Sequence, residues 1–174
     1  MASTLQNVAV SEYTSFVPTF AHSSVDQSKH IYEQNRHRVY ALAFWMTNNE
    51  LQAELLLEAT FVRAFAEYQT PDAEQIDRAL VAELRDVHMI GFLTLNCGEV
   101  TTIENIRQNT KRVHLELAVV QLPATEKLMF LMHDVEGYSH ERIARTLKVT
   151  VSNSKLGLHQ ARLRIRELVS KMVW

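Results

Sequence analysis

Two closely spaced helix breaks near the C-terminal end restrict the fold of this 174-residue chain more than any other feature. An apolar helical stripe stops at Gly137, a residue type that breaks helices. Ser139 then stands where an N-cap belongs, before a short apolar stripe from Ile143 to Leu147. Thr150 is placed to cap a third, much longer helix. The pattern predicts three helices joined by tight turns, which is typical of a helix-turn-helix domain.

The third predicted helix has two distinct faces. Successive residues turn by about 100° around a helix axis, so its side chains can be sorted by angle. The side expected to face the core is mostly apolar and consists of Ser154, Leu158, Ala161, Ile165, Leu168 and Met172. A neighbouring polar and cationic side, which suits the major groove of DNA, yields the predicted DNA-contacting residues Asn153, Lys155, His159, Arg162 and Arg166. The alternative interpretation is a solvated basic surface.

Short residue combinations mark this C-terminal region at several points. They are Leu122-Pro123, Gly137-Tyr138-Ser139, Glu141, Ile143-Ala144, Lys155, Leu158, Ala161-Arg162 and Arg166. Together they resemble the promoter-reading region of bacterial RNA polymerase sigma factors of the compact, two-domain extracytoplasmic-function type. An earlier stretch, residues 30–68, resembles the core-binding region of the same family. The matching positions in that stretch are Ala53-Glu54, Leu56, Phe61 and Ala64-Phe65.

The two resemblances occur in the family's order and cover about two-thirds of the chain. They imply an all-α fold of two small helical domains joined by a linker, the C-terminal one a helix-turn-helix. The expected parts are an N-terminal extension (1–26), a core-polymerase-binding domain (27–90), a linker (91–105) and a DNA-binding domain (106–174). The extension is either a mobile tail or a packed segment. Helices are expected at about 28–47, 50–68, 71–90 and 106–121.

In this family the second helix docks on the clamp coiled coil of the polymerase through acidic and polar residues. The resemblance implies that Glu54, Leu55, Glu58 and Arg63 bind the polymerase. Leu55 stands where the family usually has aspartate. A second interpretation is that Leu55, Leu56 and Leu57 bury a helix that is apolar most of the way round.

Residues 70–86 correspond to the family's promoter-melting segment, which usually carries aromatic and basic residues that hold an unpaired strand. This segment has no aromatic residue, only Arg78 and Arg85 as cations, and five acids. Two functions therefore stay open. The order of the two regions favours a transcription initiation factor that binds polymerase and promoter DNA, with an anti-sigma factor as a possible partner. The altered segment favours a regulator or decoy that binds polymerase or an anti-sigma factor without opening promoters.

Charge is divided unevenly along the chain. Residues 1–106 contain 6 Lys and Arg against 14 Asp and Glu, a net charge of −8, whereas residues 107–174 contain 12 against 6, a net charge of +6. This division suits a protein with a DNA-binding end and a protein-binding end.

Other residue patterns restrict the remaining function classes. The single cysteine, Cys97, excludes a disulfide within the chain and predicts a reducing cytoplasm. The polar N-terminal residues and the absence of a long apolar run predict neither secretion nor a membrane span. The histidines form no cluster with metal-ligand spacing, and no phosphate loop or nucleophile elbow is present. We therefore expect no catalytic residue, no metal and no cofactor.

Overall fold

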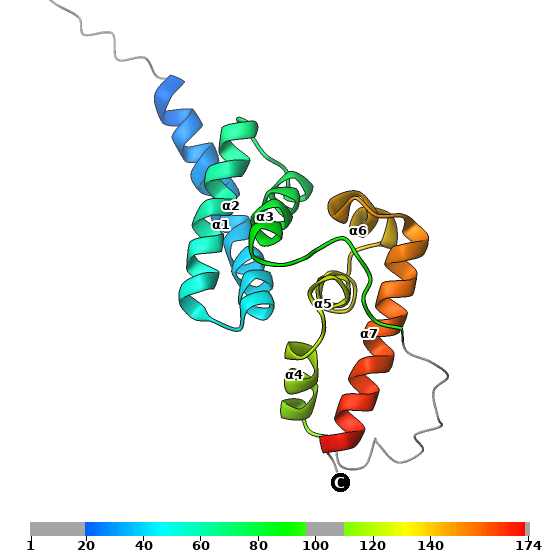
Figure 1. Ribbon diagram of the computed structural model, residues 1–174. Helices are drawn as coiled ribbons and strands as arrows, with labels where there is room; N and C mark the ends of the chain where they lie inside the picture. Colours follow the sequence, from blue (N-terminus) through cyan, green and yellow to red (C-terminus); the bar gives the residue numbers. More distant parts are fainter. Residues whose placement is uncertain (1–19, 97–109, 173–174) are drawn as a thin grey trace, which may run out of the picture.

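The computed structural model describes residues 20–96 and 110–172, with side chains described from residue 25 onward. Within these ranges the chain is helical and contains no strand (Figure 1). The elements are α1 (Phe20–Thr47), α2 (Glu50–Glu67), α3 (Ala73–Val87), α4 (Arg112–Val120), α5 (Ala124–Phe130), the π-helical turn η1 (Leu131–Val135), α6 (His140–Leu147) and α7 (Val151–Met172). The predicted all-α class with a C-terminal helix-turn-helix is confirmed.

Helices α1, α2 and α3 pack together into an N-terminal bundle (Figure 1). The chain reverses between α1 and α2 at Asn48, whose φ of 50° lies in the left-handed region that asparagine tolerates. Asn49 caps α2, because its side chain accepts a hydrogen bond from the backbone N–H of Gln52 at 3.0 Å. A capping box between Asp72 and Gln75 starts α3. The fully buried side chains of this bundle include Val39, Leu42, Ile76, Leu80 and Leu84.

Two predicted boundaries differ from the observed ones. Helix α1 begins at Phe20, so residues 20–26, which were assigned to the N-terminal extension, are helical. Helix α4 begins at Arg112 rather than near residue 106. Residues 1–19, 97–109 and 173–174 lie outside the described residues, and with them most of the extension and much of the linker. The domain limits themselves stay predictions.

Helices α4 to α7 make up the C-terminal part of the described chain, in which α7 packs against α4, α5 and α6. The apolar helix before Gly137 ends in η1, where the backbone N–H of Glu136 donates to the carbonyl of Leu131 at 3.0 Å. This i→i+5 bond changes the phase of the last turn relative to an α-helix. Val135, which lies in this last turn, is 59% exposed. Gly137 follows with a φ of 71° and turns the chain into α6.

The start of the linker lies against α5, beside α7 (Figure 1). The fully buried carboxylate of Glu126 accepts the backbone N–H groups of Thr94 and Leu95 at 2.5 and 2.8 Å. A Cβ added at Gly157 would lie 2.7 Å from Cδ2 of Leu93 and even closer to the sulfur of Met129. Glycine costs helix stability by about 1 kcal/mol relative to alanine. The absence of a side chain at Gly157 is what allows the linker to approach α7 this closely.

Candidate nucleic-acid interface and docking groove

The long C-terminal helix α7 has the buried face that its sequence pattern predicted. Ser154 and Ala161 are fully buried, Leu158, Ile165 and Leu168 are at most 8% exposed, and Met172 is packed against the core. The helix begins after Thr150, whose hydroxyl accepts the backbone N–H of Asn153 at 3.0 Å. This N-cap fixes where α7 starts and therefore which residues face outward.

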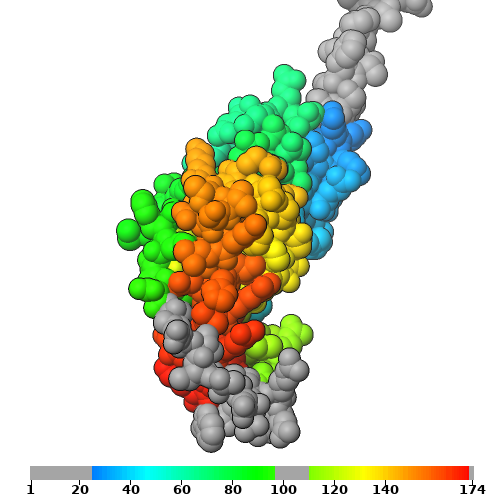
Figure 2. Space-filling model, turned by 90° about the vertical axis from the view of Figure 1, so that its right-hand side faces the viewer, coloured from blue at the N-terminus to red at the C-terminus, as the bar shows by residue number. Residues whose placement is uncertain are grey.

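All five predicted DNA-contacting side chains are exposed on α7. They are Asn153, Lys155, His159, Arg162 and Arg166. Helix α6 and the first half of α7 form part of the outer surface of the molecule, in orange in Figure 2. The arrangement presents a cationic stripe to solvent, and its contact with DNA stays a prediction.

Arg162 is held by an acid of the preceding turn. Its guanidinium makes two hydrogen bonds to the carboxylate of Asp134, at 2.9 Å from Nε and 2.5 Å from Nη2. Partial burial opposes ionisation of Asp134, but the hydrogen bonds from Arg162 and His133 outweigh it and lower the pKa of this carboxyl. A DNA phosphate would therefore have to replace Asp134 as the partner of Arg162.

Two histidines join η1, α6 and α7. The rings of His133 and His140 stack with their centroids 4.6 Å apart, and Nδ1 of His140 lies 3.0 Å from the hydroxyl of the buried Ser154. Burial, with a contribution from the nearby His133 and Lys155, lowers the pKa of His140. His140 is therefore neutral at neutral pH and can share a hydrogen bond with Ser154. Sequence analysis missed this pair, because the two rings come together only through the turn of the chain between η1 and α6.

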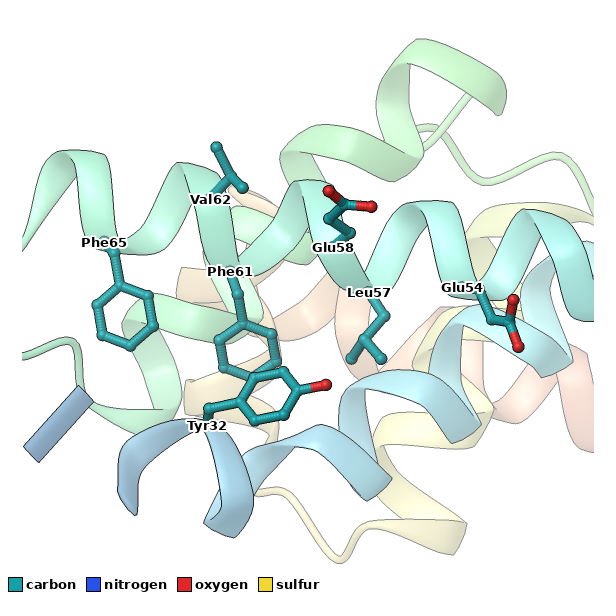
Figure 3. A pocket seen from close by; sticks show the side chains of 7 residues that line it. All are labelled: Tyr32, Glu54, Leu57, Glu58, Phe61, Val62 and Phe65. Carbon is teal, nitrogen blue, oxygen red and sulfur yellow. The ribbon is translucent and has the colours of Figure 1, made fainter. Parts of the chain in front are cut away.

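A groove of about 570 Å³ lies along α2 on the N-terminal bundle (Figure 3). The side chains that line it are Tyr32, Glu54, Leu57, Glu58, Phe61, Val62 and Phe65. The rings of Tyr32 and Phe61 pack edge to face with their centroids 4.8 Å apart, while the side chains of Glu54 and Glu58 lie apart from these rings along α2. An apolar floor next to two carboxylates suits a protein partner that carries apolar and basic side chains.

The four predicted polymerase-binding residues do not all lie at the groove. Glu54, Leu55 and Glu58 are exposed, and Glu54 and Glu58 line the groove. The interpretation that Leu55, Leu56 and Leu57 are all buried is wrong, because Leu55 is 52% exposed whereas Leu56 is 6% exposed. Arg63 does not line the groove. Its guanidinium pairs with Glu83 of α3 at 2.5 Å, which raises the pKa of Arg63.

The acids of residues 70–86 have structural partners that sequence analysis did not identify. Asp72 caps α3, and Glu83 pairs with Arg63. Glu74 and Asp77 reach across to arginines of α6. Four of the five acids of this segment therefore stabilise a helix or join two helices.

Among the described residues, no group of three or more His, Cys, Asp and Glu side chains has the arrangement of a metal site. No helix in the described part of the chain is both long and apolar enough to cross a membrane.

Comparisons with known proteins agree with this geometry. Residues 112–165 match the family model described as Sigma-70, region 4. The ECF RNA polymerase sigma factor SigE of Mycolicibacterium smegmatis (strain ATCC 700084 / mc(2)155) is 26% identical over 155 residues, which cover 79% of this chain and 60% of that protein. The chain thus spans about 60% of the length of this curated relative. A chain in the co-crystal structure of the sigma factor RpoE with the anti-sigma factor NepR from Bartonella quintana has the same fold. The TM-score is 0.56 at 16% identity, with 88% of this chain and 98% of that chain covered.

Proposed function

We propose that this chain, a relative of the extracytoplasmic-function sigma factors, is a transcription initiation factor that binds core RNA polymerase and recognises promoter DNA. The observation that carries the proposal is α7, which combines a buried apolar face with an exposed cationic stripe and lies mostly inside the region that matches sigma-70 region 4. An α-helix of this kind, presented after a short helix and a turn, is suited to the major groove. The protein acts by binding alone and works in the cytoplasm, where the polymerase is.

The N-terminal bundle supplies the polymerase contact in this proposal. A helix of the clamp coiled coil lies along the groove, with apolar side chains against Phe61 and basic side chains near Glu54 and Glu58. The exposed Leu55 adds apolar area next to the groove. Charges at the rim of such an interface set partner choice and association rate, whereas the apolar centre contributes most of the affinity.

Run-off transcription with purified core polymerase on genomic fragments tests this function. We expect discrete transcripts that require the protein. The double variant Glu54→Gln/Glu58→Gln should reduce core binding and transcription together. A matched control, Glu67→Gln/Asp86→Asn, removes the same charge from exposed sites that do not line the groove and should leave both unchanged. Absence of transcripts and of core binding would refute the proposal.

The second candidate function is that of a sigma-fold regulator or decoy that occupies polymerase or an anti-sigma factor. The absence of any aromatic residue between Thr70 and Asp86 favours it, since stacking returns about 1–3 kcal/mol per captured base. Permanganate footprinting of the polymerase complex on linear DNA separates the two functions. An initiation factor leaves reactive thymines in the promoter, and a decoy leaves none. A variant with Phe92→Ala, which removes an exposed linker ring, tests whether that ring takes part in melting.

A further inference from the structure

Two histidines occupy the junction of η1, α6 and α7, next to the cationic stripe of α7. The rings of His133 and His140, which we call the histidine pair, stack with their centroids 4.6 Å apart and their planes 27° from parallel. Nδ1 of His140 lies 3.0 Å from the hydroxyl of Ser154, which is fully buried near the start of α7. Nδ1 of His133 lies 2.8 Å from the carboxylate of Asp134, the acid that also holds Arg162. The histidine pair thus connects the start of α7 to one of the predicted DNA contacts.

The charges around the histidine pair depend on whether the stripe is free or bound. They are Asp134 of η1, Glu141 of α6, and Lys155 and Arg162 of α7. Helix α3, which also packs against α6, directs its acids Glu74 and Asp77 to arginines of α6 instead. Burial is the largest cause of the lowered pKa of His140, the cations near it lower that pKa further, and the acid of α6 opposes them. Two of the groups that keep the pair neutral, Lys155 and Arg162, are therefore members of the stripe.

A DNA duplex on α7 reverses these conditions. Phosphates neutralise the cations of the stripe, so that Lys155 and Arg162 no longer oppose a proton on His140. His140 is also the first residue of α6, the helix that crosses the DNA backbone in helix-turn-helix domains. The negative charge of that backbone attracts a proton to the nearby rings.

The release of Arg162 acts in the same direction. A phosphate that takes this arginine leaves His133 as the cationic partner of Asp134, whose side chain is only 22% exposed. A partly buried carboxylate at hydrogen-bond distance favours the protonated form of an imidazole. Two charged rings stacked this closely would repel each other, so the pair takes up one proton much more readily than two.

We propose that the histidine pair is a proton-binding site of the DNA interface, which takes up one proton when a duplex binds to α7, so that DNA binding tightens as the pH falls below neutral. The proton belongs to the pair rather than to one ring. This inference rests on the proposed function, in which α7 binds DNA. It makes promoter affinity sensitive to the acidity of the surroundings through groups that do not themselves have to touch the DNA.

Fluorescence anisotropy of the full chain with a mixed-sequence DNA duplex, measured at several pH values and constant salt, tests the proposal. His140→Gln and His133→Gln each remove a titrating ring and keep a side chain that can form hydrogen bonds. His37→Gln is the matched control, because it makes the same change at an exposed residue of α1. His159→Gln removes the exposed histidine of the stripe, which could titrate against phosphate by itself. Circular dichroism confirms that each variant is folded at each pH.

We expect the affinity of the unaltered protein to rise about fivefold between about pH 7.5 and about pH 6, because binding is linked to the uptake of one proton. His37→Gln should keep this rise, His159→Gln should keep the part due to the pair, and His140→Gln and His133→Gln should each lose most of it. In nuclear magnetic resonance, the pKa of His140 should be higher with DNA than without it, a change that a purely structural role of the ring does not produce.

The possible results separate the inference from the function on which it rests. DNA binding with the same pH dependence in His140→Gln, His133→Gln and His37→Gln would overturn the proton-binding site. Loss of the pH dependence in His159→Gln alone would assign it to the stripe and would overturn the site as well. Absence of DNA binding at every pH would refute the proposed function, and the inference with it.

Discussion

Substitution of Asp134 by asparagine should tighten DNA binding. In the structure Asp134 holds Arg162 through two hydrogen bonds, and Arg162 belongs to the cationic stripe of α7. The amide of asparagine keeps the shape of the side chain but removes the charge, so Arg162 becomes easier to transfer to a phosphate. The substitution also removes a negative charge close to the proposed DNA surface.

The size of the effect follows from the exposure of the pair. The Arg162 side chain is 47% exposed and that of Asp134 is 22% exposed. A bidentate pair of this exposure contributes about 0.5–1 kcal/mol after screening by water and salt. Release from that pair corresponds to an increase in DNA affinity of about two- to fivefold. The same variant should lose a similar amount of folding stability.

Fluorescence anisotropy with a DNA duplex at several salt concentrations measures the effect, and a double-mutant cycle assigns it. In a chain that already carries Arg162→Ala, the additional Asp134→Asn substitution has no arginine to release. It should therefore raise DNA affinity by less, through the loss of one negative charge alone. Urea unfolding of each variant confirms the stability cost. Unchanged or weaker DNA binding by Asp134→Asn would refute the competition between this carboxylate and DNA. An equal gain with and without Arg162 would show that the effect is purely one of net charge.

Three further predictions follow from the same structure. Lys155→Ala/Arg162→Ala should weaken DNA binding and reduce the logarithmic salt slope by about one for each lost phosphate contact, and an unchanged slope would remove both residues from the interface. Gly157→Ala should destabilise the protein in urea unfolding by about 1 kcal/mol. Overpacking against Leu93 and Met129 costs about 1–3 kcal/mol, and the gain in helix propensity offsets about 1 kcal/mol of that cost. A variant more stable than the unaltered protein would contradict the close approach of these side chains to Gly157. Stability should fall as the pH drops below about 6.5, because the lowered pKa of His140 means that the unfolded chain takes up the proton first. His140→Gln should reduce this fall but leave the part due to His88, whose pKa burial also lowers.

Local sequence patterns determined the helices and the outward face of α7. Ser139 and Thr150 cap α6 and α7 through hydrogen bonds to residues three positions ahead, so their roles follow from short-range sequence. The apolar periodicity of α7 likewise identified its buried side, since that periodicity records which side of a helix meets the core. The exposure of Lys155 and its neighbours followed from the same pattern.

Only the tertiary structure decided what the charged residues do. The acids of residues 70–86 could be counted in the sequence, but the partners of Glu74 and Asp77 come from a helix 65 to 71 residues further along the chain. The need for Gly157 likewise depends on where Leu93 and Met129 come to lie. Helix propensity and capping act over a few neighbouring residues, whereas ion pairs and close contacts between domains depend on how the finished helices pack. For that reason the sequence indicated a DNA-binding helix, whereas the ion pairs between α3 and α6 became visible only in the packing of the two helices.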